Sequence, residues 1–167
     1  MPDIDLAAIF NELNTVASLA GADAGGQLTS HANAIPRGTT SSDLTWPGSS
    51  RSFDMGPWRW TSIASEHFGA MPTVVRLHCT FDFGGTYHGG GLYLANVAIA
   101  FVVDSIGLGM KFDVSGSFDD PTPIGDPPNA SLKAHITIKQ YQYLMLDTTI
   151  QTDWEFRGSG YYRAAQA

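Results

Sequence analysis

Strict alternation of apolar and polar residues is the feature that most constrains how this 167-residue chain can fold. In one segment Leu77, Cys79 and Phe81 are separated by single, mostly polar residues. A period of two places successive side chains on opposite faces of a β-strand, so it predicts strands with one buried and one wet face. Four segments have this pattern: residues 73–83, 110–118, 132–139 and 150–157.

Residues 92–104 are apolar on both faces, which predicts a central strand or one that faces both a core and an interface. Residues 58–63 are a candidate sixth strand. The connections are rich in Gly and Pro, as expected of hairpin loops. The sequence therefore predicts a mainly β fold, an antiparallel up-and-down meander of five to seven strands closed as a barrel or folded as a sandwich.

Residues 1–21 have a different period, which predicts one N-terminal amphipathic helix. Acidic Asp3 and Asp5 suit a helix start, and Gly21 suits the position just past its end. We expect the apolar stripe to dock on the sheet; an α+β roll, with the helix in the concave face of an open sheet, is the alternative. The apolar positions are Leu6, Ile9, Phe10, Leu13, Val16 and Leu19.

Residues 22–57 show no hydrophobic periodicity and are rich in Gly, Ser, Thr and Pro, so we expect an extended polar arm or loop. The length of the chain fits one domain. The predicted organisation of residues 1–167 is therefore a helix (1–21), an arm (22–57) and an antiparallel β core (58–167).

Composition narrows the choice of partners. Charged residues make up 15% of the chain, against about 25% in an ordinary soluble domain, which favours self-association. The net charge is −7 and the nine basic residues are scattered, so nucleic acid is not expected as a partner. The chain shows neither a signal-peptide pattern nor an apolar run long enough for a membrane helix. We expect a protein that is cytoplasmic, or released as part of an assembly without a Sec signal, and no membrane partner.

Candidate catalytic residues are few. Arg76 and His78 share one strand face, and His135 on an adjoining strand would let the three line a pocket in a barrel. The alternative is a solvated sheet face. The string from His88 to Gly91 matches an oxyanion-hole sequence, but the G-x-S-x-G nucleophile elbow that such a string serves is missing. No catalytic residue is assigned.

Metal and cofactor signals are also weak. The five histidines form no HxH or HExxH pair, and Cys79 is the only cysteine, which excludes an internal disulfide and a Cys-based metal site. Asp119, Asp120 and Asp126 make an acidic loop without the ligand spacing of an EF-hand. We expect no metal and no cofactor.

Four aromatic residues gather in a Gly- and Pro-rich stretch: Trp46, Phe53, Trp58 and Trp60. Exposed aromatic side chains beside arginine are typical anchors of protein interfaces, so we assign these four to an interface. Two alternatives stay open, in which they pin the arm to the domain or stack on sugar rings.

Three functions follow from these features. The first is a non-enzymatic structural or interaction subunit of a homo-oligomeric assembly such as a particle, tube or virion component. The second is a small-molecule-binding β-barrel, with a cofactor-free isomerase or cyclase as its enzymatic form, which an interior packed with Leu77, Phe81, Ile99 and Phe112 would exclude. The third is a carbohydrate- or surface-binding module that uses Trp46, Trp58 and Trp60. An enzyme is the less favoured class.

Overall fold

The computed structural model describes residues 28–61, 71–107, 110–142 and 147–166. In these ranges the chain forms β-strands and one short 3₁₀ helix. In chain order they are β1 (Leu28–Ala34), η1 (Ser41–Asp43), β2 (Ser49–Trp60), β3 (Thr73–Tyr87), β4 (Gly90–Ser105), β5 (Met110–Phe118), β6 (Thr122–Ile124), β7 (Asn129–Gln142), β8 (Thr148–Arg157) and β9 (Tyr162–Gln166).

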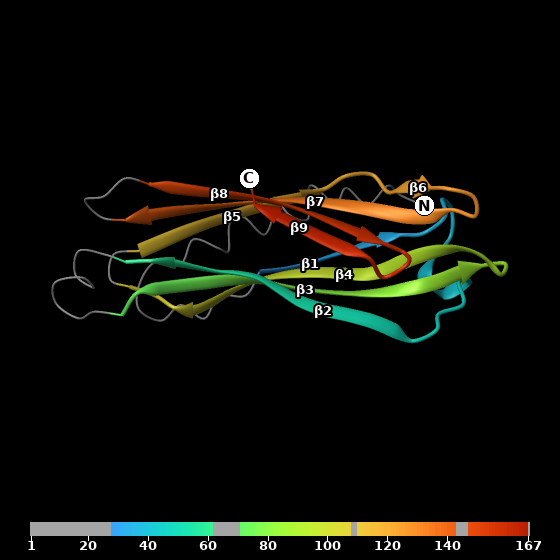
Figure 1. Cartoon of the computed structure of the whole chain (residues 1–167), viewed down its shortest axis with the longest axis horizontal. Helices are drawn as coiled ribbons and strands as arrows, with labels where there is room; N and C mark the ends of the chain where they lie inside the picture. The colour runs from blue at the N-terminus through green and yellow to red at the C-terminus, as the bar shows by residue number, and fades with distance from the viewer. Residues whose placement is uncertain (1–27, 62–70, 108–109, 143–146, 167) are drawn as a thin grey trace.

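The strands form two layers that stack face to face (Figure 1). In the first layer β3 pairs with β2 and β4, and β1 pairs with the other edge of β4. In the second layer β7 pairs with β5, β6 and β8, and β9 pairs with β8. The mainly β fold class is confirmed.

The two layers meet at one end through backbone contacts. Leu92 of β4 pairs in parallel with Asn129 of β7. Nearby, the Gly84 amide donates to the Gly158 carbonyl at 2.8 Å, and the Gly158 amide donates to the Ala130 carbonyl at 2.8 Å. A Cβ atom on Gly158 would overlap the carbonyl of Leu92, so this close approach of two chain segments requires glycine.

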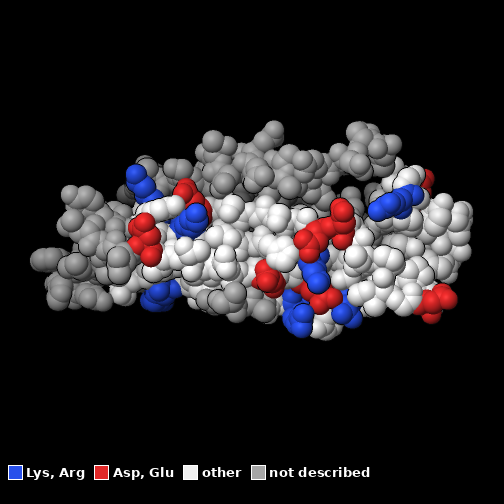
Figure 2. Space-filling model, turned by 90° about the horizontal axis from the view of Figure 1, so that it is seen from above, with Lys and Arg blue, Asp and Glu red and all other residues white. Residues whose placement is uncertain are grey.

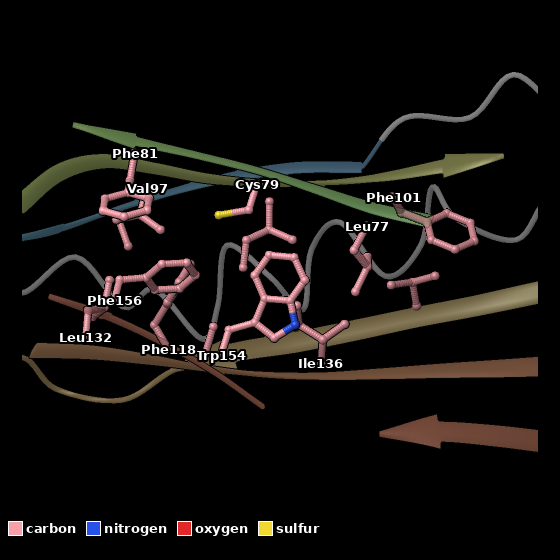
Figure 3. Packing of buried hydrophobic residues seen from close by; sticks show 14 of the residues in the cluster. Leu77, Cys79, Phe81, Val97, Phe101, Phe118, Leu132, Ile136, Trp154 and Phe156 are labelled. Carbon is pink, nitrogen blue, oxygen red and sulfur yellow. The ribbon is translucent and has the colours of Figure 1, made fainter. Parts of the chain in front are cut away.

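The core fills the space between the layers. Leu77, Phe81 and Phe101 of the first layer and Trp154 and Phe156 of the second point into this space from opposite sides (Figure 3). All five side chains are at most 1% exposed. The alternation in the sequence therefore predicted the buried faces correctly, because a strand in a two-layer fold has one face on the core and one on solvent.

The connectivity differs from the predicted up-and-down antiparallel meander. The strand predicted at 92–104 is central, since β4 lies between β3 and β1. After β4, however, the chain passes to the other layer, β5 pairs with β7, and β4 pairs with β7 in parallel. Glycine-rich connections indicate where a strand ends, and they carry no information about the layer in which the next strand pairs.

The arm expected over 22–57 contains β1, η1 and the first part of β2. Of the strand expected at 58–63, residues 58–60 are the end of the longer strand β2, and residues 62 and 63 lie outside the described residues. The alternation of β2 escapes notice because a register shift between Met55 and Trp58 interrupts it. The helix predicted over 1–21 lies outside the described residues. Within the described ranges, no helix has the length and apolarity that crossing a bilayer requires.

Candidate functional site

A polar network crosses the outer face of the first layer. Arg76 donates from Nη1 to Asp54 Oδ1 at 3.1 Å and from Nε to both carboxylate oxygens of Asp104 at 3.2 Å. The three residues come from β2, β3 and β4, and Arg76 stands two residues before His78, which pairs with Asp54 across the strands. The hydrogen bond from His78, and then the charge of Arg76, lower the pKa of the Asp54 carboxyl below its usual value.

Ser52 joins this network through His78. His78 Nδ1 lies 2.6 Å from Asp54 Oδ1, and its Nε2 lies 3.3 Å from Ser52 Oγ. This order of hydroxyl, imidazole and carboxylate is the one that activates a nucleophilic serine. The group is half-exposed, however, and Arg76 is occupied by Asp54 and Asp104 rather than directed at a reacting oxyanion. Because acyl transfer depends mainly on preorganised oxyanion donors in a dry site, we interpret the group as a cross-strand hydrogen-bond network.

His135 lies on the outer face of the second layer, so the structure does not bring it together with Arg76 and His78. Its Nδ1 is 2.7 Å from Asp153 Oδ1, and its Nε2 is 3.1 Å from Asp119 Oδ2. The predicted pocket of Arg76, His78 and His135 is therefore wrong. All three side chains point away from the core, and the two strands that carry them belong to opposite layers.

Replacing His135 by glutamine is expected to lower stability at about pH 5 and to have little effect at about pH 9. Its hydrogen bonds to Asp153 and Asp119 raise the pKa of His135 above the ordinary value of 6.5. The stabilisation is thus complete below the unfolded pKa and is lost as the pH rises through the raised folded pKa. We expect less than about 1 kcal/mol, since solvent screens this exposed group.

Urea unfolding across this pH range measures the effect of His135→Gln. Thr137→Gln, on the same strand face, is the control because it removes no titratable group, and its stability difference from wild type should stay flat with pH. A stability loss in His135→Gln that grows as the pH rises would contradict the assignment.

Three of the four predicted interface aromatics belong to β2. Phe53 stacks on Tyr162 with ring centroids 3.9 Å apart, and Trp58 is only 9% exposed. Trp60 donates from Nε1 to Thr148 Oγ1 at 3.0 Å. Phe53 and Trp60 hold β2 against the second layer, as in the pinning alternative. A contact of these side chains with a partner stays a prediction.

Trp46 differs from the other three because it lines a pocket of about 320 Å³ on the outer face of the first layer. Asp82 and Asn96 line the same pocket. Sequence analysis missed both, because Asp82 is one polar position in the alternating segment 73–83 and Asn96 is one position in the apolar segment 92–104. The positive φ of Asn96, +53°, is a further sign of a special backbone position that the sequence did not reveal.

Metal ligation and thiol chemistry receive no support from the described residues. No group of three or more His, Cys, Asp or Glu among them is placed to hold a metal ion. Cys79 is buried in the core, and this burial raises the pKa of its thiol. A buried thiol with a raised pKa is not a ready nucleophile.

Comparison with known proteins assigns the chain to no family. Proposals about its function therefore depend on its own residues. No protein-family model matches this chain, and neither a curated protein nor a solved structure was found to match it.

Proposed function

We propose that the protein is a non-enzymatic interaction subunit that associates with copies of itself through the outer face of the first layer. The distribution of lysine carries the proposal. Lys111, Lys133 and Lys139 are the only lysines of the chain, and all three are exposed on the outer face of the second layer. Figure 2, seen from above this layer, shows basic and acidic side chains intermixed on it. Such a face is well solvated.

The outer face of the first layer carries no lysine and includes an apolar stripe. Along the middle of it runs the β4 stripe, which consists of the partly exposed Ala98 and Val102 and, between them, Ala100, which is 8% exposed. Lysine is depleted from interface cores because its strongly hydrated ammonium group is costly to bury, whereas arginine in a paired network is tolerated. Arg76, directly opposite Val102 in the adjacent strand, is paired in this way with two aspartates. A lysine-free face with an apolar stripe and with Arg76, Asp54 and Asp104 paired to one another suits a self-complementary, two-fold contact.

The packed interior supports an interaction subunit over a small-molecule barrel. Leu77, Phe81, Ile99 and Phe112 are at most 3% exposed and belong to one hydrophobic cluster. These side chains, from both layers, fill the space in which an interior ligand would bind.

Val102→Arg is expected to convert an oligomer of the full chain into the 17.9 kDa monomer. A guanidinium group at this end of the β4 stripe would stand opposite Arg76, whose two aspartates are already paired, and would have to be buried in the contact as an additional positive charge. Light scattering at about 10 and about 100 µM measures the mass, and we expect the dissociation constant to rise at least about tenfold.

Thr137→Arg is the matched control, because it places the same side chain on the outer face of β7 in the second layer. It should leave the mass unchanged. A wild-type chain that is monomeric at about 100 µM, or a Val102→Arg chain that assembles like wild type, would contradict the proposal. Labelling of Ser52 by a fluorophosphonate, abolished in His78→Ala, would contradict the non-enzymatic part.

A further inference from the structure

The Trp46 pocket lies on the outer face of the first layer, where the loop around η1 approaches the start of β4. Its volume is about 320 Å³, near the lower limit for small-molecule sites. Trp46, Asp82 and Asn96 line it together with four serines. Asn96 lies near the middle of β4 and Asp104 near its end, so the pocket and the Arg76 network occupy separate parts of the layer.

The aromatic wall of the pocket is held in place before any ligand binds. Thr45 and Thr86 exchange two backbone hydrogen bonds of 2.9 Å, which fix the loop to β3. The Trp46 ring lies directly on Gly85, where a Cβ atom would come within 2.5 Å of the ring. Trp46 Nε1 donates to the Ser41 carbonyl at 2.7 Å. An indole fixed at its edge and on one side loses little conformational entropy when a ligand packs on it.

The polar wall is fixed in the same way. Asn96 has a left-handed backbone, a conformation that asparagine tolerates better than most residues. Its backbone amide donates to Asn33 Oδ1 at 2.8 Å, and its Nδ2 donates to Asp82 Oδ2 at 2.8 Å. A carboxylate and an amide oxygen offer several lone pairs, so Asp82 and Asn96 can each accept further hydrogen bonds from hydroxyl groups.

We propose that the Trp46 pocket binds a neutral sugar residue. A pyranose has an apolar C–H surface, which packs on an aromatic ring such as Trp46, and hydroxyl groups, which donate to Asp82 and Asn96. The volume accommodates one or two sugar rings. The lining includes one carboxylate and no lysine or arginine, so the charge of a sialic acid, a uronic acid or a phosphate would be repelled by Asp82 without a cation in the lining to offset it.

Titration of the full chain with methyl glycosides of glucose, galactose, mannose, fucose and N-acetylglucosamine tests the proposal. Binding is followed by calorimetry and by the NMR signal of the Trp46 indole N–H, identified in Trp46→Phe. We expect at least one neutral glycoside to bind with a Kd of about 1 mM. Trisaccharides that end in the same sugar distinguish a free sugar from a glycan end, since only a glycan end should gain affinity from further rings.

Two variants remove the two walls separately. Trp46→Ala removes the stacking surface, and Asp82→Asn removes the charge while it keeps the shape and can still accept from Asn96. Each is expected to weaken binding at least tenfold. Trp60→Phe and Asp153→Asn are the matched controls, because they change an indole and a carboxylate outside the pocket and should bind like wild type. Thermal melting verifies that each variant is folded.

Any of three results would overturn the proposal. The first is a panel in which no neutral glycoside moves the Trp46 signal at about 50 mM. The second is binding that stays within twofold of wild type in both Trp46→Ala and Asp82→Asn. The third is a preference for N-acetylneuraminic acid or inorganic phosphate over every neutral sugar.

The same titration in Val102→Arg separates this inference from the proposed self-association. Val102 does not line the pocket, so the monomeric variant should bind sugar as wild type does. Sugar binding by a wild-type chain that never assembles would support the sugar site and contradict the proposed self-association. Assembly without sugar binding would support self-association and contradict the sugar site.

Discussion

Gly158→Ala is expected to destabilise the protein by about 3 kcal/mol. The added Cβ would overlap the backbone carbonyl of Leu92, and backbone cannot rotate away as a flexible side chain can. Moving residue 158 away from Leu92 would strain its hydrogen bond with the Gly84 amide, which joins the two layers at this end, and its hydrogen bond with the Ala130 carbonyl within the second layer. Few single methyl groups elsewhere in the described chain would meet so rigid an obstacle.

Urea unfolding followed by circular dichroism measures the loss. Gly90→Ala is the matched control, because its Cβ would lie 3.8 Å from the nearest backbone atom, an ordinary contact. We expect its stability to change by less than about 1 kcal/mol. Equal stability of the two variants would show that the layers do not approach each other closely at Gly158.

Trp154→Ala is expected to cost about 3–5 kcal/mol, the range typical of a large aromatic side chain removed from a core. Trp154 is 1% exposed and lies between the layers, with its ring 4.9 Å from Phe53 and 6.1 Å from Phe156. Its Nε1 donates to Met55 Sδ at 3.1 Å and to Thr152 Oγ1 at 3.0 Å. The substitution therefore leaves a cavity and also removes contacts that hold β2 on the second layer.

Denaturant unfolding again gives the free energy. Tyr161→Ala serves as the control, since Tyr161 is 47% exposed and contacts mainly the guanidinium of Arg157. Its loss should stay below about 1 kcal/mol. A Trp154→Ala chain that unfolds at the same urea concentration as Tyr161→Ala would contradict the central position of Trp154.

The strands that alternate strictly could be predicted from the sequence, and those that do not could not. Residues 73–83 and 132–139 show which side chains are buried, because the period of two is a local property of the backbone. β2 was missed over most of its length, since the register shift after Met55 breaks the alternation that Phe53 and Met55 begin. β1 pairs with β4 far along the chain, and no local pattern specifies that partner.

The candidate sites could likewise be predicted only where they depend on the local strand pattern. The sequence places Arg76 and His78 on one strand face, and it places His135 on the polar face of another strand. Only the pairing of β3 with β2 brings Asp54 to both Arg76 and His78, and only the separation of the layers removes His135 from them.

The sequence by itself determined the β class, most of the strands and the residues of the core, since hydrophobic periodicity acts over a few neighbouring residues. The tertiary structure alone decided the two layers, the parallel contact between β4 and β7, and the pocket that joins Trp46 to Asp82 and Asn96. These features depend on cross-strand register and on contacts between distant segments. Such contacts follow from the packing of the whole chain, and for that reason no single stretch of sequence encodes them.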